Sequence, residues 1–326
     1  MARLVECVPN FSEGHRTEVV DRLAEAVLRT PGALLLDRTS DASHNRSVLT
    51  LAGEADAVIL AMDRVVEVAI GEIDMERQTG EHPRIGAIDV IPFVPLGDTT
   101  LDECVELARE FGARIARRFD LPVYLYAAAA SRSDRVKLAD VRRGQYEGLK
   151  VEIGQEGRQP DFGPARMHPS AGAVAVGARP FLIAYNINLA SDDLELARRI
   201  ARRVRESGGG LPRVQAMGVE LAATRDRPAC AQVSMNLLDF AVTPLWLVWD
   251  TVRAEAAADG LDLRESELIG LCPMAAFLAV ADHAGFDPSA SVEDRCAAAA
   301  GYLRLPDFRP MQILELRLAA AQLGDG

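Results

Sequence analysis

The order of predicted elements constrains the fold of this chain more than any other feature of its sequence. The first half reads strand, helix, hairpin, helix and strand, and apolar residues recur at spacings of three and four in both helices. These five elements fall on residues 4–9, 19–27, 33–52, 58–69 and 87–94. A third helix follows, opened by a capping box of Thr100 and Glu103, and residues 123–127 return as a strand.

The second half repeats the same order. Its elements fall on residues 181–187, 191–204, 214–238, 243–252 and 268–273, with Ser191 as the predicted cap of the first helix. Thr243 and Pro244 form the expected start of the second helix. Residues 268–273 resemble residues 85–92 in the types of residue and in their order. A chain of 326 residues also exceeds what one hydrophobic core usually organises.

We therefore predict an α/β (α+β) fold made of two similar ferredoxin-like β-α-β-β-α-β subdomains with mixed sheets. The predicted subdomains cover residues 1–178 and 179–326. Between their regular elements lies an irregular region, residues 131–179, with one expected helix over 138–149. The glycine- and proline-rich run 160–172 cannot be regular structure, and we interpret it as an ordered binding loop near an interdomain cleft.

Composition narrows the class of partner. With 36 basic and 48 acidic residues, the net charge of −12 argues against nucleic acid or an anionic membrane as a general partner. All the basic residues except Lys137 and Lys150 are arginines. This excess reflects either a GC-rich genome or guanidinium groups that bind carboxylates, and composition alone does not separate the two.

Cysteine usage and the terminus predict the compartment. The five cysteines are scattered and lack any C-x-x-C spacing, which predicts reduced thiols and neither a metal site nor a disulfide framework. The N-terminus has no long apolar run and carries Glu6, so it does not read as a signal peptide. The longest apolar runs are too short for a membrane span. We expect a soluble, cytoplasmic chain.

The five histidines are the informative titratable groups, because no hydrolase, zinc-protease or nucleotide-binding motif is present. His82 stands between Gly80 and Gly86 at the entry to a buried strand, and Pro83 restricts its backbone to extended conformations. An imidazole held there is a plausible general base at neutral pH, against the alternative that it only packs a loop. The other four have less specific settings: His15, His44, His168 and His283.

Six segments closely resemble one family, glutamate formiminotransferase, and follow its order over nearly the whole chain. They are residues 5–14 (VECVPNFSEG), 80–84 (GEHPR), 122–126 (PVYLY), 160–164 (PDFGP), 186–189 (NINL) and 233–240 (VSMNLLDF). The resemblance implies transfer of the formimino group from N-formimino-L-glutamate to N5 of tetrahydrofolate. It also implies a charged substrate tunnel between two subdomains and a homodimer. Larger relatives carry a fused cyclodeaminase, which here would be a separate protein.

The resemblance also assigns residues. His82 falls on the family's catalytic histidine, and no metal is implied. The family's folate-binding loop falls on a run of ten residues whose interior differs from the family pattern: Gly163, Pro164, Ala165, Arg166, Met167, His168, Pro169, Ser170, Ala171 and Gly172. Since both substrates are polycarboxylates, arginines should hold them. Arg46, Arg84 and Arg166 lie in predicted loops and are therefore our candidates for binding substrate carboxylates. The alternative is that they are surface arginines without a ligand.

Two other functions remain open at this point. The same fold could move a formyl group between 5-formyltetrahydrofolate and glutamate, which assays with both donors would distinguish. A non-catalytic sensor of folate or an amino acid is also compatible with a duplicated fold. That alternative predicts that the ligand binds but no product forms. It does not explain the sequence of the segment around His82.

Overall fold

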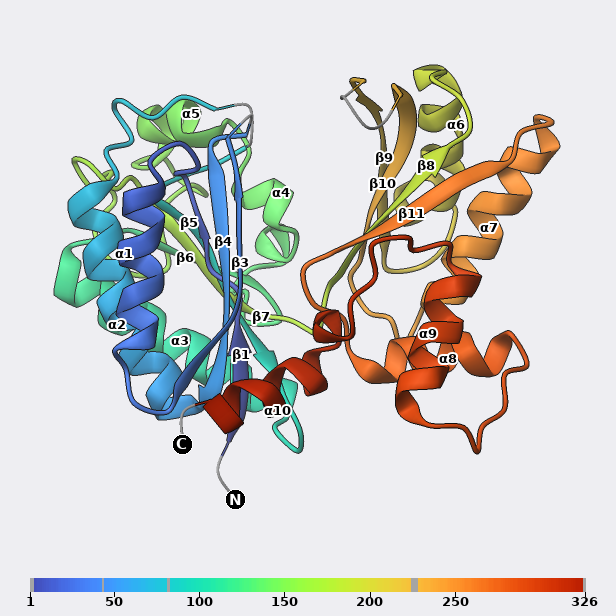
Figure 1. Cartoon of the computed structure of the whole chain (residues 1–326). Coiled ribbons are helices and arrows are strands. Elements are labelled where there is room, and N and C mark those ends of the chain that lie inside the picture. The colour runs from blue at the N-terminus through green and yellow to red at the C-terminus, as the bar shows by residue number, and fades with distance from the viewer. Residues whose placement is uncertain (1–2, 43, 81–82, 224–227, 325–326) are drawn as a thin grey trace. The chain divides into compact units, whose positions relative to one another are not determined.

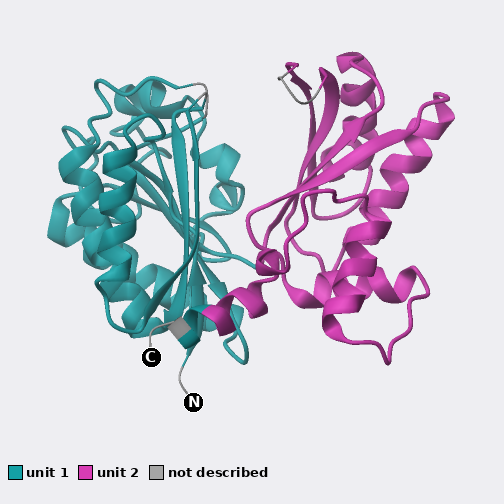
Figure 2. Cartoon of the chain, in the orientation of Figure 1, with its two compact units in different colours: residues 1–180, 321–326 teal, residues 181–320 magenta. Residues whose placement is uncertain are grey.

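The computed structural model describes residues 3–42, 44–80, 83–223 and 228–324. The predicted catalytic residue His82 lies outside these ranges. The chain forms two compact units, residues 1–180 with 321–326 and residues 181–320 (Figure 2). The sequence-based boundary at 178/179 lies beside this division, and the substrate tunnel between subdomains stays a prediction.

The first unit is built on a seven-stranded sheet (Figure 1). Its strands are β1 (Leu4–Cys7), β2 (Asn10–Phe11), β3 (Ala33–Asp41), β4 (Arg46–Glu54), β5 (Ile88–Pro95), β6 (Val123–Ala127) and β7 (Val174–Ala178). From one edge they run β3, β4, then β1 and β2 together, β5, β7 and β6. Strand β7 pairs parallel with β5 and β6, whereas the pairings of β1 to β5 are antiparallel.

Helices cover both faces of this sheet unequally. Three long helices pack their apolar stripes on one face and form the main core: α1 (Thr17–Leu28), α2 (Ala55–Glu72) and α3 (Leu101–Phe119). The opposite face is covered in part by η1 (Ser133–Arg135), α4 (Leu138–Val141) and α5 (Gln145–Glu152). There, Val141 and Leu149 pack with Tyr124 and Tyr126 of β6. The remainder of that second face carries the polar groups described below.

The second unit has a four-stranded sheet in the order β11, β8, β10, β9, with antiparallel pairings. Its strands are β8 (Ile183–Leu189), β9 (Val214–Leu221), β10 (Cys230–Leu237) and β11 (Leu263–Ile269). Its helices are α6 (Leu194–Val204), η2 (Glu206–Gly208), α7 (Leu245–Ala258), α8 (Met274–His283), α9 (Val292–Tyr302) and η3 (Pro310–Gln312). A last helix, α10 (Leu314–Gly324), begins in this unit, and its residues from 321 on are assigned to the first unit. Strands β5, β1, β4 and β3 stand in the same relative order in the first sheet. The α+β class predicted from the sequence is confirmed.

Several predicted elements differ in detail. The single helix expected over 138–149 is two helices, because Gly144 adopts a left-handed conformation (φ +79°) between α4 and α5. The irregular region also contains strand β7, which sequence periodicity missed because its two faces are both buried. Asp193, not Ser191, caps α6 by accepting from the Leu196 amide. Thr243 does not cap α7, since its hydroxyl donates to the Pro212 carbonyl.

Within the described residues, no helix combines the length and apolar character that crossing a membrane requires.

The predicted capping box at the start of α3 is present, and it supports a testable stability effect. Thr100 accepts from the Glu103 amide at 3.2 Å, and Glu103 accepts from the Thr100 amide at 2.8 Å. Replacing Thr100 by alanine leaves an unpaired amide in the first turn and should lower the free energy of unfolding by about 1 kcal/mol. Urea denaturation measures this change. The control is Thr99→Ala, one residue outside the cap, which should leave the midpoint unchanged.

Candidate active site

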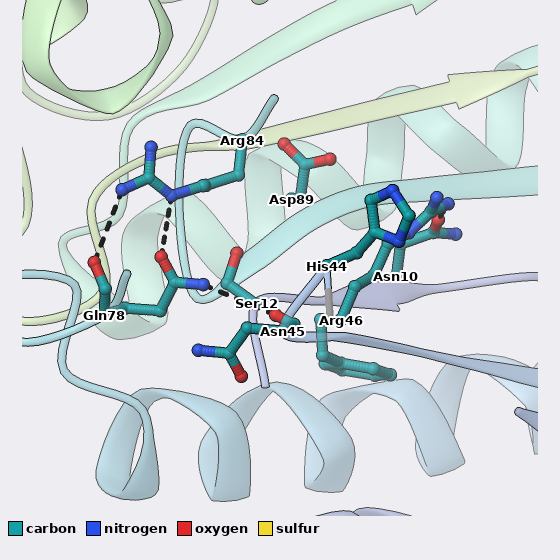
Figure 3. A pocket seen from close by; sticks show the side chains of 9 residues that line it. Asn10, Ser12, His44, Asn45, Arg46, Gln78, Arg84 and Asp89 are labelled. Atoms are coloured by element: carbon teal, nitrogen blue, oxygen red, sulfur yellow. Dashed lines mark hydrogen bonds between the residues drawn. The ribbon is translucent and has the colours of Figure 1, made fainter. Parts of the chain in front are cut away.

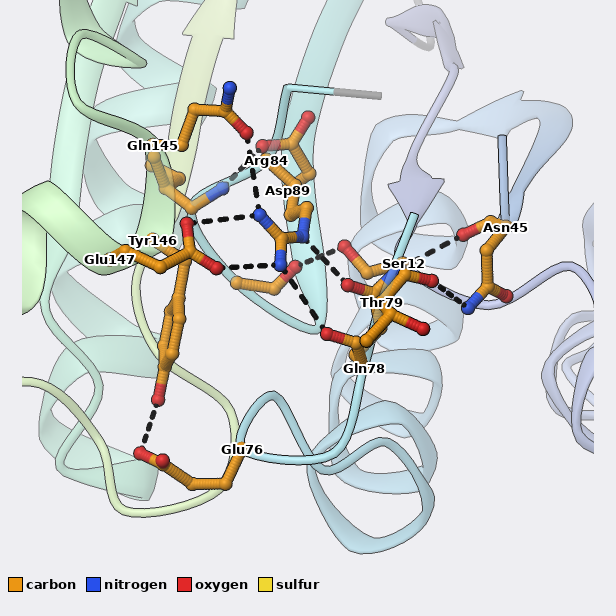
Figure 4. A network of polar contacts seen from close by, with 12 residues as sticks. Ser12, Asn45, Glu76, Gln78, Thr79, Arg84, Asp89, Gln145, Tyr146 and Glu147 are labelled. Carbon is orange, nitrogen blue, oxygen red and sulfur yellow. Dashed lines mark hydrogen bonds and ion pairs between the residues drawn. The ribbon is translucent and has the colours of Figure 1, made fainter. Parts of the chain in front are cut away.

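The segment that precedes the undescribed residues 81–82 is anchored by Asn45, at the turn between β3 and β4. Asn45 has a positive φ of 47°, a conformation that asparagine tolerates better than most residues. Its side-chain oxygen accepts from the Gly14 amide at 2.8 Å, and its amide nitrogen donates to the Thr79 carbonyl at 2.7 Å (Figure 4). One buried side chain therefore ties the start of α1 to the segment that leads toward His82.

Arg84 anchors the other side of that segment. Its Nε donates to Gln78 Oε1 at 2.7 Å, and its two Nη groups reach both carboxylate oxygens of Glu147 at 2.8 and 3.2 Å (Figure 4). Longer bonds of 3.4 Å go to the Gln78 carbonyl and to Gln145 Oε1. Arg84 is only 7% exposed, and its hydrogen bonds hold the pKa of Glu147 below its usual range. Protein acceptors engage all five N–H groups of this arginine.

This geometry favours a positioning role for Arg84 over the substrate contact expected from the sequence. Arg84→Gln should lower the free energy of unfolding by about 1–3 kcal/mol, because the largely buried guanidinium group loses its charge-assisted hydrogen bonds to Glu147. The same change should reduce kcat more than it raises the KM of the amino-acid substrate. Urea denaturation and steady-state kinetics give both quantities.

The matched control is Arg77→Gln on the same segment, where the arginine side chain is 88% exposed and lies 3.6 Å from Asp74. We expect no measurable effect there, because such exposed pairs contribute little. A raised KM with unchanged stability in Arg84→Gln would contradict the positioning role and support direct contact with substrate.

The predicted folate-binding loop lies in the first unit and is joined by hydrogen bonds to the residues that follow His82. The Ala87 amide donates to the Ala171 carbonyl at 2.8 Å, and the Ala173 amide donates to the Ile85 carbonyl at 3.0 Å. Gly86 lies between these bonds, so close to the loop that an added Cβ would come within 1.9 Å of the Ala173 carbonyl oxygen. The structure thus brings together two segments that lie about ninety positions apart in the sequence.

The interior of this loop has its own support. His168 Nδ1 accepts from the Ala171 amide at 3.0 Å and lies 3.4 Å from the Ser170 amide, so His168 shapes the turn. Burial lowers the pKa of His168, which keeps that nitrogen available as an acceptor at neutral pH. Arg166 is exposed and forms an ion pair with Asp120, so the structure places it on the surface of the loop.

A small cavity lies where β2, the turn between β3 and β4, and the side chains of Gln78 and Arg84 meet (Figure 3). Its space is about 10 Å³, which suits about one water molecule, so the surrounding side chains already lie close together. The residues that line it are Asn10, Phe11, Ser12, His44, Asn45, Arg46, Gln78, Arg84 and Asp89. Two of the predicted substrate arginines, Arg46 and Arg84, therefore face one cavity beside the anchors of the His82 segment.

Arg46 differs from Arg84 in its surroundings. Its Nη2 donates to Asn10 Oδ1, a neutral acceptor. Burial, and after it the nearby charge of Arg142, lower the pKa of Arg46 to about 10, against the opposing effect of Asp89 and Asp41. A cation that is partly desolvated beside another cation is stabilised by an anion, so this position suits a carboxylate ligand.

Sequence reasoning missed Asp89 and Arg142. Asp89 is 2% exposed, accepts from the Ile85 amide at 3.0 Å and pairs with Arg142. A charged residue inside the apolar run of β5 was a signal that could have marked Asp89. Nothing in the sequence pointed to Arg142, which follows α4 and meets Asp89 only through the fold.

A second cavity, of about 250 Å³, lies beside α4 and includes Arg135 and Arg158 in its wall. These charges are balanced within the protein. Arg135 pairs with Asp161 at 2.6 Å, and Arg158 pairs with Glu152 at 3.0 Å. We therefore place the candidate site at the first cavity.

The remaining histidines lie elsewhere or on the rim. His44 is half-exposed, lines the first cavity and contacts Asp41 through Nδ1 at 2.7 Å. His15 is exposed at the start of α1. His283 belongs to the second unit, where it contacts Asp250 at 2.9 Å and stacks on Trp246 with ring centroids 4.0 Å apart.

Two family models match this chain, and together they cover most of it. The N-terminal subdomain of the formiminotransferase domain matches residues 4–179, and the formiminotransferase domain matches residues 184–292. Glutamate formimidoyltransferase from Streptococcus pyogenes serotype M1 is 45% identical over 87% of this chain and 93% of its own length. The enzyme of the same name from Thermoplasma acidophilum is 43% identical over 91% of this chain and 98% of its length.

A third relative is longer. Formimidoyltransferase-cyclodeaminase from Rattus norvegicus is 45% identical over 85% of this chain, and the match spans 52% of the rat protein. The match thus covers about half of that relative, whereas it covers nearly all of the two shorter ones. The two family matches and the identities over most of the chain show that this protein is an enzyme of the formiminotransferase family.

Proposed function

We propose that this enzyme transfers the formimino group from N-formimino-L-glutamate to N5 of tetrahydrofolate, releasing L-glutamate and 5-formiminotetrahydrofolate. The observation that supports this proposal most directly is the pairing of residues 171–173 with residues 85–87. It brings the loop that resembles a folate-binding loop next to the strand entry that follows His82. Both partners of the proposed reaction would then meet within the first unit.

The proposed chemistry needs one group that accepts and then returns a proton. The N5 amine attacks the amidine carbon, and a tetrahedral intermediate forms while N5 loses its proton to the His82 imidazole. The imidazolium then protonates the nitrogen of glutamate, and the bond between that nitrogen and the amidine carbon breaks. Each proton transfer by a positioned imidazole is typically worth about 10²–10⁴-fold in rate. No covalent enzyme intermediate is needed in this scheme.

The described residues supply recognition in this scheme. Loop residues 163–172 would hold tetrahydrofolate, and their backbone is already fixed by the bonds to residues 85–87 and by the Met75 amide, which donates to the Ser170 carbonyl at 2.7 Å. Arg46 would hold a carboxylate of the amino-acid substrate. Asn45 and Arg84 would position the segment that carries His82.

The decisive experiment is tetrahydrofolate-dependent release of glutamate from formiminoglutamate by the purified chain. We expect turnover with this donor pair and little with 5-formyltetrahydrofolate and glutamate. Preference for the formyl pair would assign the alternative transfer, and tight binding of folate without any product would support the non-catalytic alternative. The homodimer and the separate cyclodeaminase partner stay predictions that size-exclusion and co-purification measurements can test.

A further inference from the structure

One tyrosine, Tyr146, contacts two segments that the proposed reaction needs side by side. It lies in the first turn of α5 and is 4% exposed. Its hydroxyl donates to Glu76 Oε1 at 2.7 Å (Figure 4). Its ring belongs to the same buried cluster as Met75 and Ala171. Tyr146 therefore joins the segment that leads toward His82 to the end of the loop at 163–172.

The ring of Tyr146 supports the end of that loop. A Cβ added to Gly172 would lie 3.0 Å from Tyr146 Cε2, so the ring lies directly against this glycine. The backbone makes a second connection nearby, because the Met75 amide donates to the Ser170 carbonyl at 2.7 Å. The two segments are thus joined twice, once directly through the backbone and once through Tyr146.

The residues on either side of Tyr146 hold Arg84. Glu147 binds both Nη groups of the arginine, and Gln145 Oε1 lies 3.4 Å from Nη1 (Figure 4). Since Arg84 also donates to Gln78, the first turn of α5 is linked to the chain on both sides of residues 81–82. Three consecutive residues of α5 therefore contact the loop and the two ends of the segment that contains His82.

The start of α5 has an unfavourable backbone conformation. Gly144 and Gln145 both have positive φ, of 79° and 54°. The left-handed region is sparsely populated by residues other than glycine, so the surroundings hold Gln145 there. Such conformations cluster at functional sites, where the contacts that they make possible matter more than local strain. The position of this turn is therefore a second observation that favours a functional role for its contacts.

Glu76 is well placed to accept from Tyr146. Lys150, one turn further along α5, pairs with the Glu76 carboxylate, and its Nζ lies 5.7 Å from the centre of the Tyr146 ring. Hydrogen bonds from Lys150 and Tyr146 hold the pKa of Glu76 below its usual range. Burial, and after it the hydrogen bond to Glu76, raises the pKa of Tyr146. The hydroxyl therefore remains a donor, and Glu76 an acceptor, across the pH range of an enzyme assay.

We propose that Tyr146 is a positioning residue for formimino transfer, whose ring and hydroxyl hold the loop at 163–172 against the segment that precedes His82 and so set the affinity for tetrahydrofolate. This inference rests on the proposed transferase function. Tyr146 acts through Gly172 and Glu76 and touches neither substrate. A residue that only filled the core would need its ring but not its hydroxyl, and this difference can be measured.

The main variant is Tyr146→Phe, which keeps the ring and removes the hydrogen bond to Glu76. We expect the KM of tetrahydrofolate to rise by about 3- to 10-fold, as loss of one hydrogen bond produces, and the KM of formiminoglutamate to stay unchanged. The matched control is Tyr302→Phe in the second unit, where the hydroxyl donates to a carboxylate oxygen of Asp250 at 2.8 Å. This control removes an equivalent bond and should change neither KM.

Glu76→Ala tests whether the hydroxyl acts through Glu76. The KM of tetrahydrofolate should rise by a similar factor, and the double variant with Tyr146→Phe should show no larger effect than either single change, because both remove the same bond. Two effects that multiply in the double variant would overturn the proposal. So would an unchanged KM of tetrahydrofolate in Tyr146→Phe, or a rise confined to the KM of formiminoglutamate.

Hydrogen exchange separates failure of this inference from failure of the proposed function. The Met75 amide, which donates to the Ser170 carbonyl, should exchange faster in Tyr146→Phe than in the wild type, and at the wild-type rate in Tyr302→Phe. No substrate is needed, so the measurement holds even for a chain without turnover. Faster exchange without transfer would reject the transferase function and leave the positioning contact standing. Unchanged exchange of the Met75 amide would overturn the positioning role whatever the kinetics.

Discussion

Replacing His82 by alanine should abolish formimino transfer while the chain still folds. The proposed imidazole acts in two proton transfers, each typically worth about 10²–10⁴-fold in rate. We therefore expect kcat to fall by about 10⁴-fold or more. Binding of tetrahydrofolate should persist, because backbone bonds to residues 85–87 hold the end of the loop at 163–172. Single-turnover assays and folate titrations measure the two effects separately.

Three further measurements sharpen the His82 prediction. The acidic limb of the wild-type pH profile of kcat/KM should be absent from the variant, since a general base must be unprotonated to accept a proton. Added imidazole should restore part of the rate. The control is His15→Ala, an exposed histidine of the same unit, which should leave kcat unchanged. A His82→Ala enzyme that keeps a wild-type rate and pH profile would remove His82 from the mechanism.

Local signals in the sequence predicted local structure well. The capping box of Thr100 and Glu103 depends on residues three positions apart, and the structure contains both of its hydrogen bonds. Both hairpins are also present, as β3 with β4 and β9 with β10. Such features follow from propensity and spacing within a few residues, which is the range over which a single sequence is informative.

Features that depend on contacts between distant segments were not predictable. Periodicity extended one helix through residues 138–149, but Gly144 breaks it, and Arg142, which lies between the two helices, pairs with Asp89. Likewise, Arg84 was expected to face substrate because of its loop position, whereas in the structure its donors meet Gln78 and Glu147. Loop position shows that an arginine can reach a ligand, but only the fold shows which acceptors it meets.

Gly172→Ala should produce the second large effect, because it disrupts the contact between the loop and the strand entry. Gly172 has a φ of +72°, and a Cβ there would lie 2.6 Å from the Ile85 carbonyl oxygen and 3.0 Å from Gly86 Cα. The left-handed conformation alone costs a non-glycine residue about 1–2 kcal/mol. Backbone displacement adds about 1–3 kcal/mol more, because two rigid segments must separate.

Gly97→Ala is the matched control for this change. Gly97 also has a positive φ, of 57°, but no atom lies within 4 Å of the position that a Cβ would take there. It should therefore lose only the conformational part of the free energy of unfolding, and the difference between the two variants in urea denaturation isolates the loop contact. If residues 163–172 bind tetrahydrofolate, the KM for tetrahydrofolate should rise in Gly172→Ala and stay unchanged in Gly97→Ala. Equal losses of stability and equal KM values in both variants would show that the contact between residues 171–173 and 85–87 contributes to neither, and would remove the main support for a shared site.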